Sequence, residues 1–182
     1  MQEQAIRWVL RFFHIRITQT IQESGERISS SALRTALASG DLQLAEKLLG
    51  RPYGISGHVI HGQQLGRQLG FPTLNLAVAN HLHHRKPATT GIFTAQVLGL
   101  SDKPLPAVAS LGVRPTVEDE GRVLLETHIF DYNADVYGKI ITVELLEKIR
   151  DEAKYPDLET LTQAIASDAA HARNYFQKKA YV

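Results

Sequence analysis

The sequence predicts a mainly β fold: a closed antiparallel barrel with a C-terminal helix, preceded by a short helical segment. From Ile55 the apolar residues alternate with period 2, and each apolar run is short and bounded by Gly, Pro, Asn or Asp. No helical pattern separates these runs before residue 156, which favours antiparallel strands that close on one another. We therefore expect a helical segment in residues 1–50 and a barrel domain in residues 51–182, with the boundary at Arg51-Pro52.

The composition is that of a globular protein without cysteine. The 182 residues are 43% hydrophobic and 21% charged, which excludes a disordered chain and allows one domain with an appendage. A formal net charge of +1 provides no basic excess for nucleic acid, and no apolar run approaches the roughly 20 residues that span a bilayer. We expect a cytoplasmic protein without disulfides and without nucleic-acid or membrane partners. The oligomeric state stays open.

Helical patterns dominate the first fifty residues. Residues 5–13 carry apolar side chains at helical spacing, and alternation over residues 15–21 predicts a short strand. Residues 28–50 predict two short helices. A serine of the run Ser29–Ser31 can cap the first helix, which Gly40 ends; Asp41 can cap the second, which Gly50 ends.

Six runs have the pattern of barrel strands. They are Ile55–His61, Leu74–Ala79, Gly91–Leu100, Leu105–Gly112, Val123–Tyr132 and Lys139–Glu147. The closing stretch, residues 156–176, is helical; Asp157 can cap it, and its apolar stripe should pack on the barrel as a plug or lid. That stripe comprises Leu158, Leu161, Ile165, Ala169, Ala172 and Phe176.

Three glycines four residues apart begin the stretch around which we expect the functional site. Gly62, Gly66 and Gly70 permit tight turns whose N–H groups can bind an anion. Arg67 adds a fixed positive charge between the second and third glycines. The spacing matches neither a loop ending in Gly-Lys-Ser/Thr nor a dinucleotide-binding G-x-G-x-x-G. A Gly-rich surface hairpin followed by a Pro-Thr turn is the alternative.

Thr73 and Asn75 follow this loop, two residues apart. In extended backbone such residues share a face, so their hydroxyl and carboxamide oxygens can reach one point. Neutral oxygens suit Mg²⁺, which completes its coordination with water and substrate phosphates. The pattern therefore indicates a magnesium–phosphate site.

Glu126 is a carboxylate in the middle of a predicted strand. Alternation places it on the face of His128 and Phe130, and places Thr127 on the other. Because burial of an unpaired carboxylate is costly, Glu126 needs a partner, access to solvent or a shifted pKa. A cross-strand pair with Arg or Lys and a position at the barrel mouth are the structural alternatives to a functional role.

His81, His83 and His84 lie close together in a polar stretch. They could bind a metal, but zinc sites usually take ligands from a second segment as well, and the sequence offers no obvious partner. We interpret the three histidines as part of a solvated loop.

The order of these features resembles the riboflavin kinase family. Gly70-Phe71-Pro72-Thr73-Leu74-Asn75 is similar to that family's Gly-Phe-Pro-Thr-Ala-Asn signature, with Leu74 in the alanine place and expected to point away from the Thr73/Asn75 face. Leu125-Glu126-Thr127-His128, followed by Asp131, Asp135, Tyr137 and Gly138, resembles the stretch that carries the family's catalytic glutamate. The resemblance implies that Glu126 is the catalytic base.

Three further segments extend the resemblance over about residues 51–176. Ser110 to Thr116 resembles an Ile-Gly-x-x-Pro-Thr turn, Ile149 to Tyr155 an Ile-Arg-x-Glu-x-x-Phe flavin loop, and Thr90 to Phe93 a strand start at the adenine site. The residues implied to bind ATP phosphates or adenine are Gly62, Gly66, Arg67, Gly70, Phe71, Pro72, Thr73, Asn75 and Gly91, with Thr73 and Asn75 also implied as metal ligands. The residues implied to bind the flavin are Arg114, Arg150, Glu152 and Tyr155.

Membership of this family implies a six-stranded Greek-key barrel that converts riboflavin and MgATP to FMN and ADP. Residues 29–34 also resemble the Ser-Ser-Thr-x-Ile-Arg motif near the end of the adenylyltransferase half of bacterial bifunctional FAD synthetases. The rest of that half has no counterpart here, so we expect Ser29, Ser30 and Arg34 to be a remnant or linker and expect no adenylyltransferase activity. A non-catalytic flavin- or nucleotide-binding barrel, an oligonucleotide-binding barrel and a complete bifunctional enzyme are the alternatives.

Overall fold

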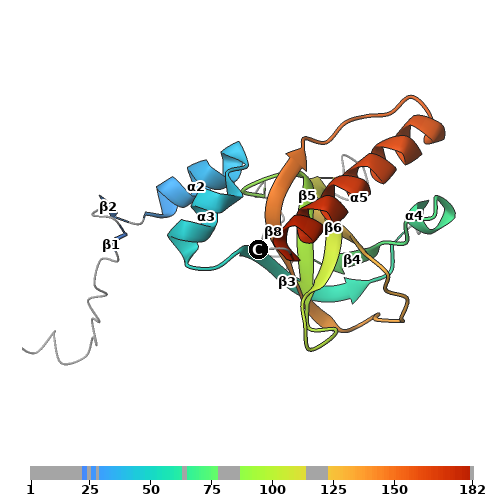
Figure 1. Cartoon of the computed structure of the whole chain (residues 1–182), viewed down its shortest axis with the longest axis horizontal. Helices are drawn as coiled ribbons and strands as arrows, with labels where there is room; N and C mark the ends of the chain where they lie inside the picture. The colour runs from blue at the N-terminus through green and yellow to red at the C-terminus, as the bar shows by residue number, and fades with distance from the viewer. Residues whose placement is uncertain are drawn as a thin grey trace, which may run out of the picture.

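Six antiparallel strands close into a barrel in the computed structural model, which describes residues 22–23, 26–27, 29–62, 65–77, 87–113 and 123–180 (Figure 1). The strand order around the barrel is β3-β4-β7-β6-β5-β8, and β8 pairs with β3 to close it. The strands are β3 (Tyr53–Ile60), β4 (Leu74–Ala77), β5 (Gly91–Leu98), β6 (Leu105–Val113), β7 (Val123–Ile129) and β8 (Ile140–Arg150).

The connection of these strands is a Greek key. Strands β5, β6 and β7 pair in succession, and β8 returns to lie beside β5, giving the spatial order β8-β5-β6-β7. The predicted closed antiparallel barrel is therefore confirmed, as is the Greek key that the family resemblance implied. Several strand ends differ from the prediction by one or two residues, and two differ by three: β7 ends at Ile129, and β8 continues to Arg150.

Alternate residues of the strands fill the barrel interior. Phe93 and Val97 of β5, Leu111 of β6 and Leu125 of β7 are all 0% exposed and belong to one apolar cluster. Their immediate neighbours point to the outer wall, so the period-2 pattern read from the sequence corresponds to inside and outside.

Phe93→Ala should destabilise the protein by about 3–5 kcal/mol, because it removes a large buried ring and leaves a cavity that the rigid barrel cannot fill. Phe93 is the largest of the fully buried side chains. The free energy of unfolding from chemical denaturation measures this effect. A loss below about 1 kcal/mol would contradict a close-packed interior around this ring.

The N-terminal helix α2 (Ser30–Ser39) packs against the next helix, α3 (Leu42–Leu49), which packs against β3 and β8 of the barrel. Their predicted caps are confirmed. The Ser29 Oγ accepts a hydrogen bond from the Ala32 N–H at 3.1 Å, and the Asp41 Oδ1 accepts one from the Leu44 N–H at 2.9 Å. The terminating glycines, Gly40 and Gly50, have φ values of 78° and 70°, a left-handed conformation that glycine adopts without strain.

The two helices share the core of the barrel. The buried side chains that they contribute to the main apolar cluster are Ala36, Leu37, Leu42 and Ala45. The predicted domain boundary near residue 50 stays a prediction, and these contacts show that the helices dock on the strands. Two short strands before them, β1 (Gln22–Glu23) and β2 (Glu26–Arg27), form a separate sheet. The helix predicted at residues 5–13 and the strand predicted at 15–21 lie outside the described residues.

The C-terminal helix α5 (Leu158–Ala180) crosses the outer wall of the barrel (Figure 1). Asp157 caps it, because its Oδ1 accepts a hydrogen bond from the Thr160 N–H at 2.7 Å. Ala169 and Ala172 are buried against Val108 and Phe130, as the predicted stripe requires. Leu158 is an exception and is 58% exposed, since it begins the helix outside this contact.

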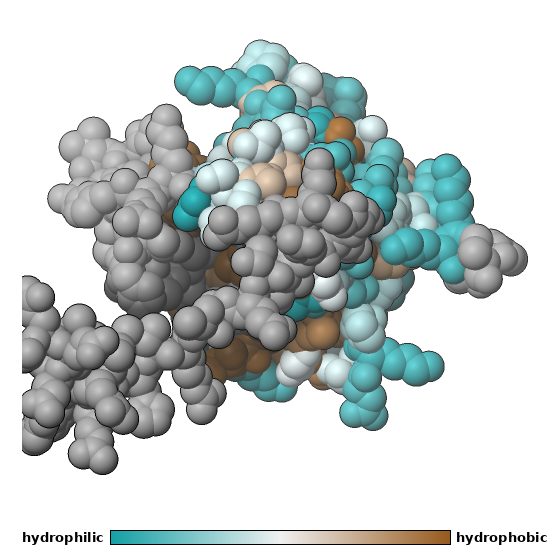
Figure 2. Space-filling model, turned by 90° about the vertical axis from the view of Figure 1, so that its left-hand side faces the viewer, coloured by the Kyte–Doolittle hydropathy of each residue, from teal (hydrophilic) through white to brown (hydrophobic). Residues whose placement is uncertain are grey.

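The described surface is mainly hydrophilic on the face drawn in Figure 2, with hydrophobic residues visible toward its lower edge. Helix α5 is the longest helix of the described part, and no helix in that part is both long and apolar enough to cross a membrane.

Candidate active site

A cavity of about 260 Å³ lies on the outer wall of the barrel, between strands β6 and β7 and the first half of helix α5. Its lining unites three groups of residues that were identified separately in the sequence. The predicted members are Gly66, Phe71 and Thr73 from the glycine-rich stretch, Glu126 from β7, and Arg150, Glu152 and Tyr155 from the end of β8 and the loop after it. The site therefore forms on the wall under helix α5, rather than at the barrel mouth.

Thr73, directly before strand β4, and Asn75 on that strand lie on the outside of the barrel. Leu74 between them is buried in the interior, which confirms that it points away from the Thr73/Asn75 face. Asn75 is 4% exposed, and its Oδ1 has no hydrogen-bond partner among the described residues. Such a buried, uncompensated acceptor has room for a donor or a cation as ligand, so the oxygens of Thr73 and Asn75 fit a hard metal ion.

The glycine-rich stretch contains a short helix, α4 (Leu65–Gln68), which the sequence did not predict. After it the chain turns back tightly: the Phe71 N–H donates to the Gly66 carbonyl at 2.7 Å, and Gly70 has φ 84°. The N–H groups of Leu69 and Gly70 also donate to carbonyls inside the turn. The N–H groups of Leu69, Gly70 and Phe71 therefore stabilise the loop itself. If the stretch binds an anion as predicted, other N–H groups must donate to it.

Glu126 stands between two polar neighbours on the outer wall. The strand register places it opposite Asn75 on β4 and opposite Ser110 on β6. It is half-buried and lines the cavity, while the next residue, Thr127, is fully buried on the inner side. The predicted division of β7 into two faces is thus confirmed, and it brings the carboxylate beside the carboxamide of Asn75.

His128 is a member of the site that sequence reasoning did not identify. It lies two residues after Glu126 on the same face, and its Nδ1 hydrogen-bonds the Pro72 carbonyl at 2.8 Å. Because a carbonyl only accepts, Nδ1 carries the proton in this contact. Its ring also meets Phe71 and Phe130 edge-on, each at 5.7 Å between centroids. His128 therefore connects the loop before β4 to strand β7, which carries Glu126. Its position two residues after Glu126 on the same strand is the feature of the sequence that could have identified it as a site residue.

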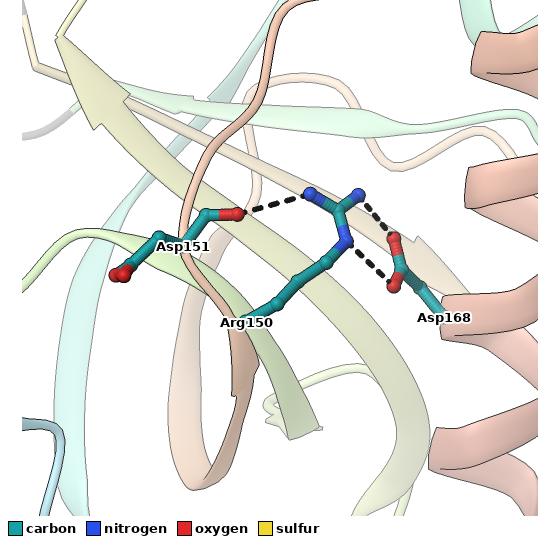
Figure 3. Close-up of polar contacts among 3 residues, drawn as sticks. All are labelled: Arg150, Asp151 and Asp168. Atoms are coloured by element: carbon teal, nitrogen blue, oxygen red, sulfur yellow. Dashed lines mark hydrogen bonds and ion pairs between the residues drawn. The ribbon is translucent and has the colours of Figure 1, made fainter.

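Arg150 ends strand β8 at the cavity and is held by helix α5 (Figure 3). Its Nε and Nη2 donate to the two carboxylate oxygens of Asp168 at 2.9 and 2.6 Å, and its Nη1 donates to the Asp151 carbonyl at 3.0 Å. The hydrogen bonds to Asp168 raise the pKa of Arg150, so its charge is permanent. The Tyr155 ring lies 5.8 Å from the guanidinium carbon.

Glu152 folds its carboxylate over the backbone of strand β6. A Cβ added to Gly112 would lie 2.0 Å from the Glu152 Oε1, so the absence of a side chain at Gly112 creates the space for this carboxylate. Although much of Glu152 is exposed, partial burial raises the pKa of its carboxyl. Gly112, the glycine of the predicted turn, thus has a steric role beside the cavity.

Several predicted residues lie beside the cavity or outside the described chain. Gly91 begins β5 with φ 133°, and a Cβ there would lie 2.5 Å from the Arg150 carbonyl oxygen. Arg67 is exposed on α4. Arg114 and the predicted histidine loop, residues 81–84, fall outside the described residues. Within the described part, no group of three or more His, Asp or Glu side chains is arranged to hold a metal.

Acid should weaken the attachment of helix α5 through Asp131. Arg173 donates two hydrogen bonds to this carboxylate, at 2.8 and 3.0 Å, and they hold the pKa of Asp131 below its usual 3.8. A carboxyl with a lowered folded-state pKa stabilises the fold above its unfolded value, and this stabilisation is lost as the pH falls through the folded value. Asp131→Asn should therefore lower Tm at neutral pH, and its difference from the parent should vanish well below pH 3.8. Thermal unfolding across a pH series measures the difference in Tm between the variant and the parent protein. A Tm difference that did not depend on pH would contradict the stabilising role of the Asp131–Arg173 pair.

Comparison with known protein families and curated proteins gives consistent matches. The family model described as "Flavokinase: Riboflavin kinase" matches residues 49–176. The bifunctional riboflavin kinase/FMN adenylyltransferase of Escherichia coli (strain K12) is 48% identical over 164 residues, which cover 90% of this chain and 51% of the relative. The protein of the same description from Bacillus subtilis (strain 168) is 36% identical over 162 residues, covering 88% and 50%. The chain spans about half the length of these curated relatives.

Two solved structures share the fold. A crystal structure from Streptococcus pneumoniae described as a macrolide-efflux protein matches with a TM-score of 0.72 at 31% identity, over 86% of this chain and 50% of that one. The crystal structure of riboflavin kinase from Trypanosoma brucei matches with a TM-score of 0.51 at 26% identity, over 70% of this chain and 81% of that one.

Proposed function

Because the chain belongs to the riboflavin kinase family, we propose that it transfers the γ-phosphoryl group of MgATP to the ribityl 5′-hydroxyl of riboflavin, giving FMN and ADP. One observation carries the proposal beyond family membership: Glu126 lines the cavity in register with Asn75. A carboxylate next to the oxygens of the predicted metal and phosphate site is the arrangement that phosphoryl transfer to a hydroxyl requires.

Glu126 is the proposed general base. As the ribityl oxygen bonds to the γ-phosphorus, its proton passes to the Glu126 carboxylate, the bond from the γ-phosphorus to the bridging oxygen breaks, and ADP leaves. The flanking Ser110 and Asn75 give the carboxylate polar neighbours on both adjacent strands. His128 holds the neighbouring loop through Pro72.

The glycine-rich stretch and strand β4 are the proposed ATP site. Thr73 and Asn75 would hold Mg²⁺, which when bound neutralises charge on the ATP phosphates. The glycines at 62, 66 and 70 let the chain pass close to the nucleotide, and Arg67, Phe71 and Pro72 complete the loop. Gly91 is the proposed contact on the adenine side.

The isoalloxazine ring of riboflavin is proposed to occupy the cavity under helix α5. Ile92, Val108 and Leu161 supply apolar surface there. The polar contacts are assigned to Arg150 and Glu152, and the stacking face to Tyr155. Arg114 is a further proposed flavin ligand, and we place the reaction in the cytoplasm, where ATP is available.

Product analysis tests the proposal. The chain is incubated with riboflavin, ATP and Mg²⁺, with and without a chelator, and the flavins are separated by chromatography. We expect FMN and ADP in equal amounts, a large loss on chelation and on Asn75→Ala, and no FAD. Riboflavin binding without FMN formation would favour the alternative, a non-catalytic flavin-binding barrel. FAD formation would show an adenylyltransferase activity that we do not expect.

A further inference from the structure

Helix α5 contributes one carboxylate to the wall of the cavity. Asp168 is 6% exposed, although its neighbours on the buried side of the helix, Ile165, Ala169 and Ala172, are apolar. A buried carboxylate at such a position is costly unless it is paired and hydrogen-bonded. Asp168 is both, because its two oxygens accept the fork of Arg150 (Figure 3).

The geometry of this pair determines which part of Arg150 faces a ligand. A guanidinium has five N–H groups, and Asp168 accepts from the edge formed by Nε and Nη2. The Asp151 carbonyl accepts from Nη1. The N–H groups that remain lie on Nη1 and Nη2, at the outer edge of the guanidinium. A bidentate contact on one edge thus fixes the orientation of the other edge.

We propose that Asp168 is a positioning residue of the flavin site, which holds Arg150 from helix α5 so that the outer edge of the guanidinium meets the polar edge of the isoalloxazine ring. The inference rests on the proposed function, because it takes Arg150 as a flavin contact. Asp168 itself acts through Arg150 and need not touch the flavin.

The charge of the pair also suits this ligand. Riboflavin is uncharged, and a partly buried arginine without a paired carboxylate would favour an anion instead. Asp168 makes the pair neutral overall while leaving directed N–H donors. Because Asp168 lies on α5, the orientation of the Arg150 N–H donors at the cavity also depends on α5 packing against the barrel.

A second arginine–aspartate pair provides a matched control. Arg173 of α5 donates two hydrogen bonds to Asp131 after β7, so this pair also fastens the helix to the barrel. The Asp131 side chain is 79% exposed, against 8% for the side chain of Asp168 alone, and neither Arg173 nor Asp131 lines the cavity. A role limited to holding the helix would make the two pairs equivalent, whereas a positioning role would distinguish them.

Riboflavin binding, followed by the change in its own fluorescence without ATP, tests the proposal in four variants: Asp168→Asn, Arg150→Gln, the double variant and Asp131→Asn. We expect Asp168→Asn to raise the riboflavin Kd about tenfold or more. In protein that already carries Arg150→Gln, Asp168→Asn should change the riboflavin Kd by less than about a further twofold, since Asp168 acts through Arg150. Asp131→Asn should leave the Kd unchanged, and steady-state kinetics should show the KM for MgATP unaffected by Asp168→Asn.

Two results would overturn the inference: equal effects of Asp168→Asn and Asp131→Asn on the riboflavin Kd, or an Asp168→Asn effect that persists in full without Arg150. Should Asp168→Asn fail to fold, Asp168→Glu retains the charge and displaces the guanidinium, and an unchanged Kd in that variant would equally contradict the proposal. The proposed function fails separately, when the parent protein neither binds riboflavin nor forms FMN.

Discussion

Glu126→Gln should reduce the turnover number for FMN formation by about two to four orders of magnitude, the usual contribution of a positioned general base. The glutamine has the same shape and can keep polar contact with the neighbouring strands, but it cannot accept the proton of the attacking hydroxyl. Riboflavin and MgATP should still bind, so KM should change much less than kcat. Initial rates of FMN formation at saturating substrates measure the effect.

Glu144→Gln is the matched control for this experiment. Glu144 is also a half-buried strand glutamate, and its carboxylate accepts a hydrogen bond from the Gln96 amide at 2.7 Å. It does not line the cavity. Loss of activity in both variants would indicate a general effect of removing a charge from the barrel wall. Undiminished FMN formation by Glu126→Gln alone would remove Glu126 as the base while leaving the kinase reaction in place.

The fold could be predicted from the sequence wherever the information is local. Alternation along each strand predicted the strands and their two faces, and the candidate caps predicted where three helices begin: a serine of the run Ser29–Ser31, which is Ser29 in the structure, Asp41 and Asp157. Strand ends were less predictable because they depend on distant residues. Strand β8 reaches Arg150 because irregular pairing with β5 continues that far. The chain leaves β7 through Asp131, whose φ of 54° is rare for a residue other than glycine and whose carboxylate meets Arg173 on the distant helix α5.

The sequence predicted many residues of the site, but it predicted less well which of them lie next to one another. Spacing alone placed Thr73 and Asn75 on one face, but the pairing of Asn75 with Glu126 depends on the register between β4 and β7. Asp168 carries no local signal of its role, because its neighbours in the stripe of α5 are apolar and its partner Arg150 lies 18 positions away. The docking of a helix on the outer wall decides where the cavity forms, and no local pattern contains that information.

Gly62→Ala should impair activity about as strongly as Asn75→Ala, with a loss on the order of a hundredfold, because a displacement of about 1 Å in a positioned group can cost that much. A Cβ at position 62 would lie 1.9 Å from the Asn75 Nδ2 and 2.7 Å from its Cγ. No real contact is that short, so the buried carboxamide or the backbone of Gly62 must move. The displaced group is the one that we assign to the metal and phosphates.

The kinetic signature separates this effect from simple unfolding. Gly62→Ala should raise the KM for MgATP or lower kcat while riboflavin binding in the absence of ATP is preserved, because an added Cβ would meet Asn75 and none of the residues that we assign to the flavin. Gly50→Ala is the control: Gly50 has φ 70°, and nothing lies within 4 Å of an added Cβ, so that variant carries backbone strain without touching the site. If Gly62→Ala and Gly50→Ala lost the same stability and neither lost activity, the close approach of Gly62 to Asn75 would have no functional role.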